Sequence, residues 1–435
     1  MQQTETPFPN LESQIRAYDR QIFLELVKLA EFNVRYQQNV NHYARWRKII
    51  YPLAQESVYG CLLAFSITDM SQRYRGWDNP GKISPTSTKV ALEGAMVGTL
   101  IGGTSSMIEL AANGVEEWKA RRLGYSNAKA VSSVRSKVKL IDEALASRSA
   151  LMRQIDRNCA SWELLKLKEE LLHYERERLL FEFKRWNAHS RGVAWNKNTF
   201  YIVNSAVNFS RFSAITLGLK SFTAPRASGA IGPVLSTAAS LAGLGPAASS
   251  VAGNWVQRRQ ERSLEKLLPS KAPLTDAEAK QKFDRLTELL ESDESKAQNL
   301  RVAKELIHLR QEKLALDTLI FSEEKNIERF RLVAGQQALI APPVSSMGLA
   351  SAILSTVGYH GFRNQPIINN RLSFTGDAIV IPAESIALIA TPAAAIRTYM
   401  YEKNLSKKNE HPDQLLSKRL KDLEELEATV TEAWR

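Results

Sequence analysis

The chain has 435 residues, of which 44% are hydrophobic, 24% charged and 8% aromatic. This composition is that of an ordinary globular protein, and it excludes a wholly disordered or low-complexity chain. Lysine and arginine outnumber aspartate and glutamate by 58 to 46, and the net charge of +12 indicates an acidic partner, either anionic lipid or nucleic acid. The two cysteines, Cys61 and Cys159, exclude a disulfide framework and a cysteine-based zinc site. The N-terminal segment is polar and acidic, so no secretory signal is expected.

A basic–aromatic pair occurs three times, and a second aromatic residue follows each pair at a similar distance. The pairs are Arg45-Trp46, Arg185-Trp186 and Arg329-Phe330, and the residues that follow are Trp118, Trp255 and Tyr399. From the aromatic residue of each pair, the separations are 72, 69 and 69 residues. Each interval holds an apolar stretch, a short polar loop and a longer stretch rich in Ala, Gly and Ser. The pattern predicts three tandem repeats, with approximate limits at 1–157, 158–298 and 299–435.

Charged, leucine-rich segments flank these intervals and carry apolar residues at every third or fourth position. Examples are Leu11, Ile15, Tyr18 and Ile22; Val131, Val134, Val138 and Ile141; Leu164, Leu167 and Leu171; and Leu416, Leu420 and Leu423. Such stripes are typical of amphipathic helices or coiled-coil seams. Each repeat is therefore predicted to be a long helix, an apolar helical hairpin and a second long helix, in an all-α fold. The hairpins are expected at about 52–118, 198–257 and 332–400.

Proline residues mark the expected ends of the helices. Pro52, Pro342 and Pro343 stand where the first long helix of a repeat meets its apolar stretch, and Pro80, Pro85 and Pro225 fall in the hairpin loops. Since proline cannot continue a helix cleanly, kinks or helix starts are expected at these positions.

Two runs, 227–257 and 332–362, contain no charged residue, and each is 31 residues long. A helix needs about 20 residues to cross the hydrocarbon core of a bilayer, so both runs are long enough for a membrane hairpin. The other apolar stretches are shorter or contain a charge. All are rich in Ala, Gly and Ser rather than Leu, which makes their insertion free energy modest.

Small residues recur at helical spacing within the apolar stretches. Small side chains on one helix face let two backbones approach closely, as they do in membrane helix pairs. The same geometry also serves tight packing inside a soluble helical bundle, and both interpretations stay open. The predicted helix-packing residues are Gly94, Gly98, Gly102, Ala239, Gly243, Ala247, Ala383, Ala387 and Ala395.

Aromatic and cationic residues cluster where the apolar stretches meet the long helices. An indole beside cations suits the headgroup layer, where the ring is half-buried and the cations meet lipid phosphate. The alternative is that the same residues cap the end of a soluble helical bundle. The predicted interface residues are Arg45, Trp46, Arg47, Lys48, Trp118, Lys119, Arg121, Arg122, Arg185, Trp186, Trp195, Trp255, Arg258, Arg259, Arg329, Phe330 and Tyr399.

If each hairpin crosses the membrane twice, every long helix lies on the same face. The density of Lys and Arg at the junctions predicts that this face is cytoplasmic, although the far loops carry cations too. Ionisable residues inside the apolar stretches are costly in lipid and should face a bundle interior or a watery path; in a soluble protein they would be exposed helix positions. They are Glu56, Glu93, Glu109, Arg211 and Glu384.

No pattern in the chain predicts an enzyme, a cofactor or a metal site. The six histidines have no metal-ligand spacing. The segment GWDNPGK at 76–82 has the spacing of a phosphate-binding loop, but it lacks the Ser or Thr that must follow the lysine. We therefore expect a protein without catalytic activity.

The favoured prediction is a membrane-embedded helical protein that acts as a channel, pore or membrane scaffold, with a coiled-coil body in the cytoplasm. Its expected partner is a lipid membrane with anionic headgroups, and a homo-oligomer or a helical partner protein is possible. The alternatives are a soluble α-helical pore-forming protein that inserts on membrane contact, and a soluble helical scaffold. Nucleic-acid binding is disfavoured, because the basic residues gather beside tryptophans rather than along one helix face.

Overall fold

The computed structural model describes residues 8–40, 47–155, 162–223, 225–270, 276–291, 343–408 and 411–433. Within these ranges the chain is helical and contains no strand, which confirms the predicted all-α class. The helices are α1 (Phe8–Asn39), α2 (Arg47–Arg75), η1 (Pro80–Lys82), α3 (Pro85–Arg122), α4 (Asn127–Met152), α5 (Trp162–Lys220), α6 (Pro225–Ala242), α7 (Gly245–Leu267), α8 (Asp276–Glu291), a helix over 343–361, α10 (Pro366–Lys407) and α11 (Pro412–Ala433).

Local sequence explains where several helices begin. Ser84 caps α3 by accepting a hydrogen bond from the Ser87 amide at 3.3 Å, and Ser126 caps α4 in the same way. Such caps satisfy amide donors that have no partner inside the helix. Proline occupies the first position of α3, α6, α10 and α11, where its missing amide hydrogen costs nothing.

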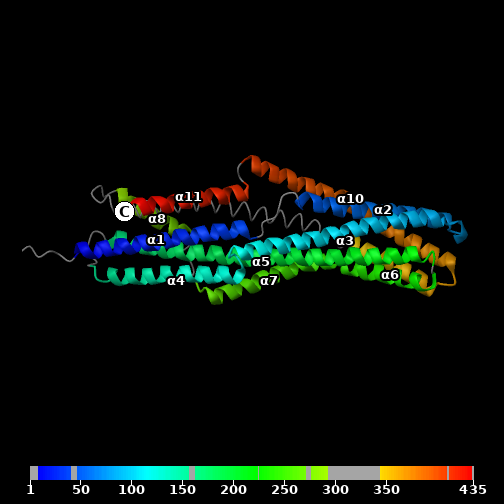
Figure 1. Cartoon of the computed structure of the whole chain (residues 1–435), viewed down its shortest axis with the longest axis horizontal. Coiled ribbons are helices and arrows are strands. Elements are labelled where there is room, and N and C mark those ends of the chain that lie inside the picture. Colours follow the sequence, from blue (N-terminus) through cyan, green and yellow to red (C-terminus); the bar gives the residue numbers. More distant parts are fainter. Residues whose placement is uncertain are drawn as a thin grey trace, which may run out of the picture.

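The molecule is elongated, and helices α1, α4, α8, α11 and the first half of α5 form one end of it (Figure 1). We call this end the body. Its core is built from large apolar side chains of α1, α4, α5, α8 and α11, including Phe23, Ile141, Phe183, Phe283 and Leu423. The apolar stripes predicted for these helices therefore pack against one another, as in an ordinary soluble helical domain.

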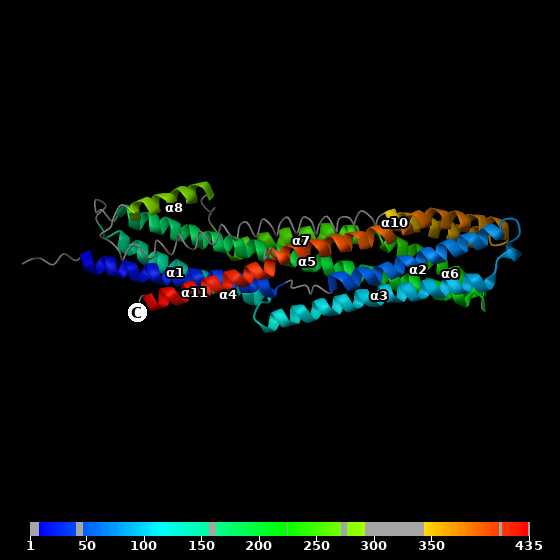
Figure 2. The same ribbon diagram turned by 90° about the horizontal axis from the view of Figure 1, so that it is seen from above.

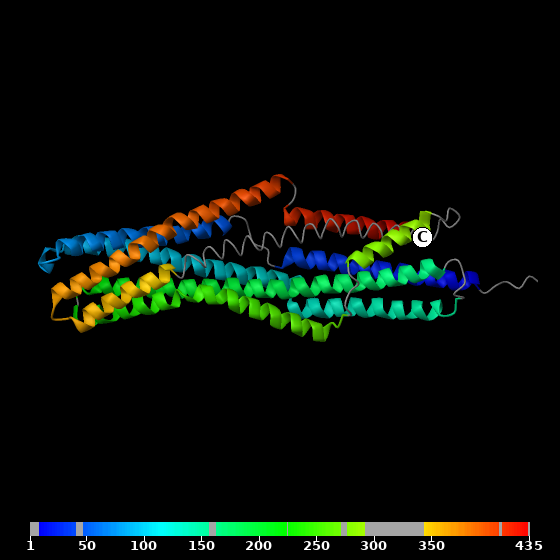
Figure 3. The same cartoon turned by 180° about the vertical axis from the view of Figure 1, so that it is seen from behind.

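Three helical hairpins extend from the body and turn at the opposite end of the molecule (Figures 1 and 3). The first is α2–α3, the second is formed by the second half of α5 with α6 and the start of α7, and the third is the helix over 343–361 with α10. We call residues 47–122, 192–257 and 343–407 the hairpin bundle. Seen from above, the body and the bundle lie end to end along one axis (Figure 2).

Helices of the bundle make a continuous circuit of contacts, and its first part joins α2, α3, α5 and α6. A Cβ added at Gly98 of α3 would lie 2.5 Å from Cys61 Cβ of α2. On the other side of α3, Asn113 Nδ2 donates to Asn198 Oδ1 of α5 at 3.0 Å. Gly232 of α6 lies against the backbone of α5, with its hypothetical Cβ 3.3 Å from the Ala214 carbonyl oxygen.

The second part of the circuit returns to α2 through the third hairpin. Thr237 of α6 meets Thr356 of the helix over 343–361, with 3.3 Å between the two hydroxyl oxygens. That helix packs on α10, where Gly376 lies against Ser351. Asn370 Nδ2 of α10 donates to the Gly76 carbonyl oxygen, which follows α2, at 3.0 Å. Six helices thus close a ring, and its interior is filled by side chains.

Two features of the helices differ from the sequence expectation. Helix α2 begins at Arg47, five residues before the start expected for the first hairpin near residue 52, so Pro52 lies inside it. Helix α5 runs unbroken for 59 residues from the body into the bundle, where a long helix and a separate hairpin arm were expected. Helix α5 contains no proline and only two glycines, Gly192 and Gly218. A helix tolerates single glycines at a cost of about 1 kcal/mol each.

The predicted residues Arg45, Trp46, Arg329 and Phe330 lie outside the described residues, as does most of the first long helix expected in the third repeat.

Candidate membrane-spanning bundle and its polar interior

Apolar residues in the hairpin bundle face outward, the reverse of their placement in the body. Among the described residues, the exposed large hydrophobic side chains that lie outside the bundle are Leu123, Leu140, Phe181 and Leu267. All others belong to the bundle, and they include Ile50, Leu53, Ile67, Val90, Val97, Leu100, Ile101, Met107, Ile108, Val115, Ile202, Ile231, Val234, Leu241, Val251, Met347, Ile353, Val357, Ile386, Ile389, Ile396 and Met400. A soluble domain rarely exposes so large an apolar surface, which is typical of contact with lipid or with a partner.

Two helical segments are long and apolar enough to cross a membrane. They are Pro85–Met152, which includes α3, and Pro366–Lys407, which is α10. A core helix of a soluble protein passes the same test of length and composition. Here, however, 39% of the apolar window in the first segment and 28% of that in the second are buried within the protein, so most of each window is at least partly accessible.

Four predicted interface aromatics lie exposed where the bundle meets the body, and we call Trp118, Trp195, Trp255 and Tyr399 the body-side belt. Three of them carry a cation over the ring: Arg122 lies 4.8 Å from the Trp118 centroid, Arg259 lies 5.3 Å from that of Trp255, and Lys403 lies 5.9 Å from that of Tyr399. Such pairs suit the headgroup layer, where ring and cation are both half-solvated.

Contacts between the helices place the three tryptophans at a similar height along the bundle. Gln260 of α7 donates to Asn127, the first residue of α4 and five residues beyond the end of α3, at 3.2 Å. Gly253 of α7 packs against Gly192 of α5, with a hypothetical Cβ 3.0 Å from the Gly192 carbonyl oxygen. The ends of α3, the middle of α5 and the middle of α7 therefore lie side by side.

The other predicted interface residues take several positions. Lys119, Arg121, Arg122, Arg185, Arg258 and Arg259 are exposed. Trp186 is half-buried and meets His189 edge-on, with 6.1 Å between the ring centroids. Lys48 belongs to α2, one residue after Arg47.

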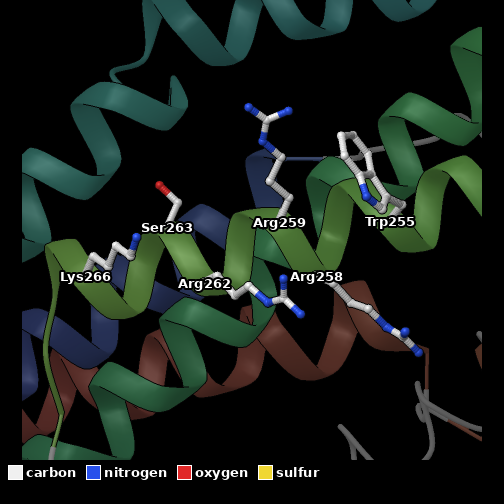
Figure 4. A pocket seen from close by; sticks show the side chains of 6 residues that line it. All are labelled: Trp255, Arg258, Arg259, Arg262, Ser263 and Lys266. Carbon is white, nitrogen blue, oxygen red and sulfur yellow. The ribbon is translucent and has the colours of Figure 1, made fainter.

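Helix α7 presents a basic pocket of about 600 Å³ beside the body-side belt. It is lined by Trp255, Arg258, Arg259, Arg262, Ser263 and Lys266. Trp255 and Arg259 project to one side of α7, whereas Arg258 and Arg262 project to the other (Figure 4). Four cations on one short stretch of helix can bind phosphate groups, the chemistry expected of anionic headgroups.

A second aromatic group lies at the far end of the bundle and was missed by the sequence analysis. Trp77 meets Phe374 edge-on with 5.2 Å between the centroids, and Arg371 lies 4.9 Å from the Trp77 centroid. Tyr74 is exposed beside the same turn, and Phe222 is exposed in the turn that follows α5, at the same end of the bundle (Figure 1). We call Tyr74, Trp77, Phe222 and Phe374 the tip-side belt. Repeat comparison could not find it, because Trp77 has no tryptophan counterpart in the other hairpins.

The two belts are separated by about the thickness of a bilayer. On α10, Phe374 and Tyr399 are 25 residues apart. At a rise of 1.5 Å per residue this separation is about 38 Å. A bilayer measures about 30 Å across its hydrocarbon core and about 40–45 Å with its headgroup layers.

Arg47 lies inside the bundle rather than at its surface, with only 2% of its area exposed. Its guanidinium donates to Glu109 Oε2 from Nε at 3.0 Å and from Nη2 at 2.7 Å. It also donates to Glu116 Oε1 and to Asn113 Oδ1, each at 2.7 Å. This network fastens the start of α2 to α3. The arginine is buried because Glu109, itself 4% exposed, needs a counter-charge.

Most of the predicted small residues lie at close helix contacts. Gly98 and Gly102 face α2, and a Cβ at Gly102 would lie 2.4 Å from Val58 Cγ2. Gly243 approaches Ser345, and Ala239, Ala383 and Ala387 are buried. Gly94 has open space around its hypothetical Cβ, Ala395 is half-buried and Ala247 belongs to α7.

The predicted ionisable residues divide into an outer and an inner set. Glu93 is exposed on α3 with its carboxylate 3.9 Å from Lys89 Nζ. Glu384 is only 6% exposed and lies within hydrogen-bonding reach of Ser66. Arg211 and Glu56 lie in electrostatic range of the enclosed Tyr59 hydroxyl, as Glu384 does. The centre of the ring therefore holds charged groups from α2, α5 and α10.

Polar side chains continue from this centre toward both ends of the bundle. Toward the body, Asn204 Nδ2 donates to Tyr51 Oη at 2.8 Å, to Gln55 Oε1 at 3.0 Å and to Ser106 Oγ at 3.0 Å. Beyond them lies the Arg47 network. Toward the tip, Arg73 Nε pairs with Asp69 Oδ2 at 2.7 Å and with Asp377 Oδ2 at 3.5 Å.

The body holds an ion pair with a clear electrostatic consequence. Lys184 Nζ donates to Glu265 Oε2 at 2.6 Å, and Lys184 is almost fully buried while Glu265 is largely exposed. The hydrogen bond from Lys184 lowers the pKa of Glu265 below its ordinary value.

In the part of the chain that the structure describes, no group of three or more His, Cys, Asp or Glu side chains is placed to hold a metal ion. No family model, curated protein or solved structure matches the chain.

Proposed function

We propose that this protein is a membrane-embedded channel without catalytic activity, whose three hairpins cross the bilayer and whose body stays outside it. The observation that carries the proposal is the reversal of polarity between the two ends of the molecule. The body buries most of its large apolar side chains, whereas the bundle exposes most of them and packs its interior with small and polar ones; charged groups are buried at both ends. In lipid the outer apolar surface meets hydrocarbon, and the buried polar groups are satisfied within the protein.

The belts support this proposal and suggest how the bundle sits in the bilayer. Their separation of about 38 Å on α10 matches a membrane with part of its headgroup layers. Cations over aromatic rings at both levels would meet lipid phosphate. We place the body on the cytoplasmic side, because the cations of α3 and α7 are dense at the body-side belt, including those of the basic pocket on α7.

A channel is favoured over an inert scaffold because the interior of the ring is polar along its length. Charged and hydrogen-bonding side chains in a membrane interior are costly and usually mark a pathway for an ion or substrate. A scaffold would need only apolar and small residues at these positions.

A second candidate is a soluble pore-forming protein that inserts its hairpins on membrane contact. The sequence of α3 favours it, because glycine, serine and threonine alternate with the apolar residues of this helix and make it only modestly apolar. The extended arrangement speaks against it, because the hairpins project from the body and are not folded back on it (Figure 1).

Flotation of the full-length protein with liposomes, followed by carbonate extraction, tests the proposal. The protein should float and resist extraction, and recovery as a monodisperse species in detergent-free buffer would contradict constitutive insertion. If that soluble species then permeabilises added vesicles, the second candidate replaces the first.

A matched pair of variants sharpens the experiment. Ile389 on α10 is 72% exposed, and Leu140 in the body is 44% exposed. Lysine near the middle of a membrane helix costs about 2.5–3.5 kcal/mol. Ile389→Lys should therefore reduce carbonate-resistant insertion, whereas Leu140→Lys should leave it unchanged; equal behaviour of the two variants would argue against membrane insertion of α10.

A further inference from the structure

The charges inside the ring do not balance. Among the described residues, this interior holds four carboxyl groups and two guanidinium groups. The carboxyl groups are those of Glu56, Asp69, Asp377 and Glu384, and the guanidinium groups are those of Arg73 and Arg211. An unpaired charge in an apolar medium is strongly disfavoured, so excess carboxylates must acquire a positive charge or become neutral. The interior therefore needs about two further cations or protons.

One contact identifies the proton as the species that restores the balance. The carboxyl groups of Asp69 and Asp377 lie within hydrogen-bonding reach of each other, and Arg73 pairs with both. Within the described part of the chain, Asp377 Oδ2 receives no hydrogen bond. Two carboxylates cannot donate to each other, so this contact is satisfied when one of the two carries a proton.

Glu384 provides a second site two helical turns from Asp377 on the same face of α10. Glu384 is 6% exposed, and its Oε2 has no hydrogen-bond partner while the carboxyl group lies in reach of Ser66. Its charged neighbours are Arg211 of α5 and, on α10 itself, Asp377. The Tyr59 hydroxyl of α2 also lies in its electrostatic range.

Glu56 completes the centre of the ring. Both of its carboxyl oxygens are enclosed and lack a hydrogen-bond partner, and it shares the surroundings of Tyr59 with Arg211 and Glu384. From there the polar side chains Gln55, Tyr51 and Asn204 lead to the Arg47 network. At that end Glu116 is 29% exposed, which opens the series of polar groups to solvent beside the body.

The spacing of the acids differs from that of a metal-binding cage. Asp377 and Glu384 are seven residues apart, about 10 Å along the helix. A divalent cation gathers six or more oxygen ligands at about 2.0–2.6 Å, which groups so far apart cannot provide together. Single acids and hydroxyl groups spaced along the interior can instead take up and release protons one after another, and the amides of Gln55 and Asn204 only line this path with hydrogen-bonding groups.

We propose that the bundle conducts protons through this series, with Asp377 and Glu384 as its proton-binding residues; this inference rests on the proposed membrane-embedded channel. In this proposal bridging water carries the proton from a protonated Asp377 to Ser66, whose hydroxyl lies within reach of Glu384. Ser66 accepts the proton on its hydroxyl oxygen and passes its own hydroxyl proton to Glu384. Asp377 is left as a carboxylate and Glu384 becomes the acid. Asp377 is reprotonated from the tip side, and Glu384 passes its proton toward Glu56 and the body-side end.

Proton flux into proteoliposomes tests the proposal. The purified full-length protein is reconstituted with a pH-sensitive dye inside the vesicles, and a potassium diffusion potential drives the flux. Wild-type protein should acidify the lumen, and Glu384→Gln and Asp377→Asn should each reduce the initial rate by about tenfold or more, because an amide cannot take up and release a proton. Gln at 384 keeps a group that can hydrogen-bond to Ser66.

Glu93→Gln is the matched control, since this carboxylate lies exposed on the outer surface of α3 and should keep the wild-type rate. Flotation and helicity of every variant separate loss of conduction from loss of folding. Inserted protein that passes potassium or chloride but no protons would overturn the inference and leave the channel standing. Inserted protein that passes no ion overturns both the inference and the channel, while failure to insert refutes the proposed function at its root.

Discussion

Replacing Arg47 by methionine should destabilise the protein strongly, because it removes a buried counter-charge from the carboxylate of Glu109. Methionine fills a similar length of side chain but provides no donor, so Glu109 loses its contacts at 2.7 and 3.0 Å while staying 4% exposed. Removing one partner of a buried ion pair costs about 3–5 kcal/mol. For a cooperative unit the size of the bundle this loss corresponds to a fall in Tm of about 10 °C.

Thermal unfolding followed by circular dichroism in detergent micelles measures the effect. Arg121→Met is the control, since Arg121 is 64% exposed and pairs with Glu117 one helical turn away. An exposed pair of this kind contributes about 0.5 kcal/mol or less. Adding Glu109→Gln to Arg47→Met should recover part of the loss, because a buried amide is less costly than a buried carboxylate that has lost this counter-charge. Equal Tm values for Arg47→Met and Arg121→Met would show that the buried Arg47–Glu109 pair contributes no more to stability than an exposed ion pair.

Two further substitution experiments test the packing of the bundle and the charges of the body. Gly102→Ala should lower the free energy of unfolding by about 1–3 kcal/mol, because the added Cβ would clash with α2. Gly94→Ala should raise it by about 0.5–1 kcal/mol, because nothing lies within 4 Å of the added Cβ and alanine is the better helix former. The opposite order of the two Tm values would contradict the close α2–α3 contact. The folded-state pKa of Glu265 lies below its ordinary value of 4.5, so the Lys184 pair stabilises the fold fully above that pH and is lost as the pH falls through the folded pKa. Glu265→Gln should therefore weaken the fall in unfolding free energy at acid pH. At neutral pH it should lower that free energy by less than about 1 kcal/mol, because Glu265 is largely exposed. A dependence of stability on pH identical to that of the wild type would exclude this contribution.

The helical class followed from local sequence because its signals are local. Stripes such as Leu164, Leu167 and Leu171 need only the 3.6-residue period to be recognised, and they lie in α5 as helix. Pro85 and Pro225 also correctly predicted the starts of α3 and α6. The unbroken course of α5 was harder to predict, because no residue near 192–198 indicates that one helix passes from the charged segment into the apolar one.

Residues of the interior depend on contacts that the local pattern does not contain. Arg47 stands in a cluster of cations and an aromatic residue, so its sequence resembles that of its exposed neighbours. Its partner Glu109 lies 62 residues away, and nothing in either segment points to the other. Glu384 was singled out as a charge inside an apolar stretch, but Asp377 and Asp69 were not. Their meeting depends on the register of α10 against α2, which only the folded structure supplies.

Helix α5 connects the two ends of the molecule as a single stiff rod. Its 59 residues span about 88 Å at 1.5 Å per residue, with one half among the apolar side chains of the body and the other beside the polar interior. In a continuous helix, a rotation imposed at one end reaches the other, since each turn is held to the next by backbone hydrogen bonds. A twist applied to the body would thereby reach the half of α5 that carries Arg211 beside the polar interior.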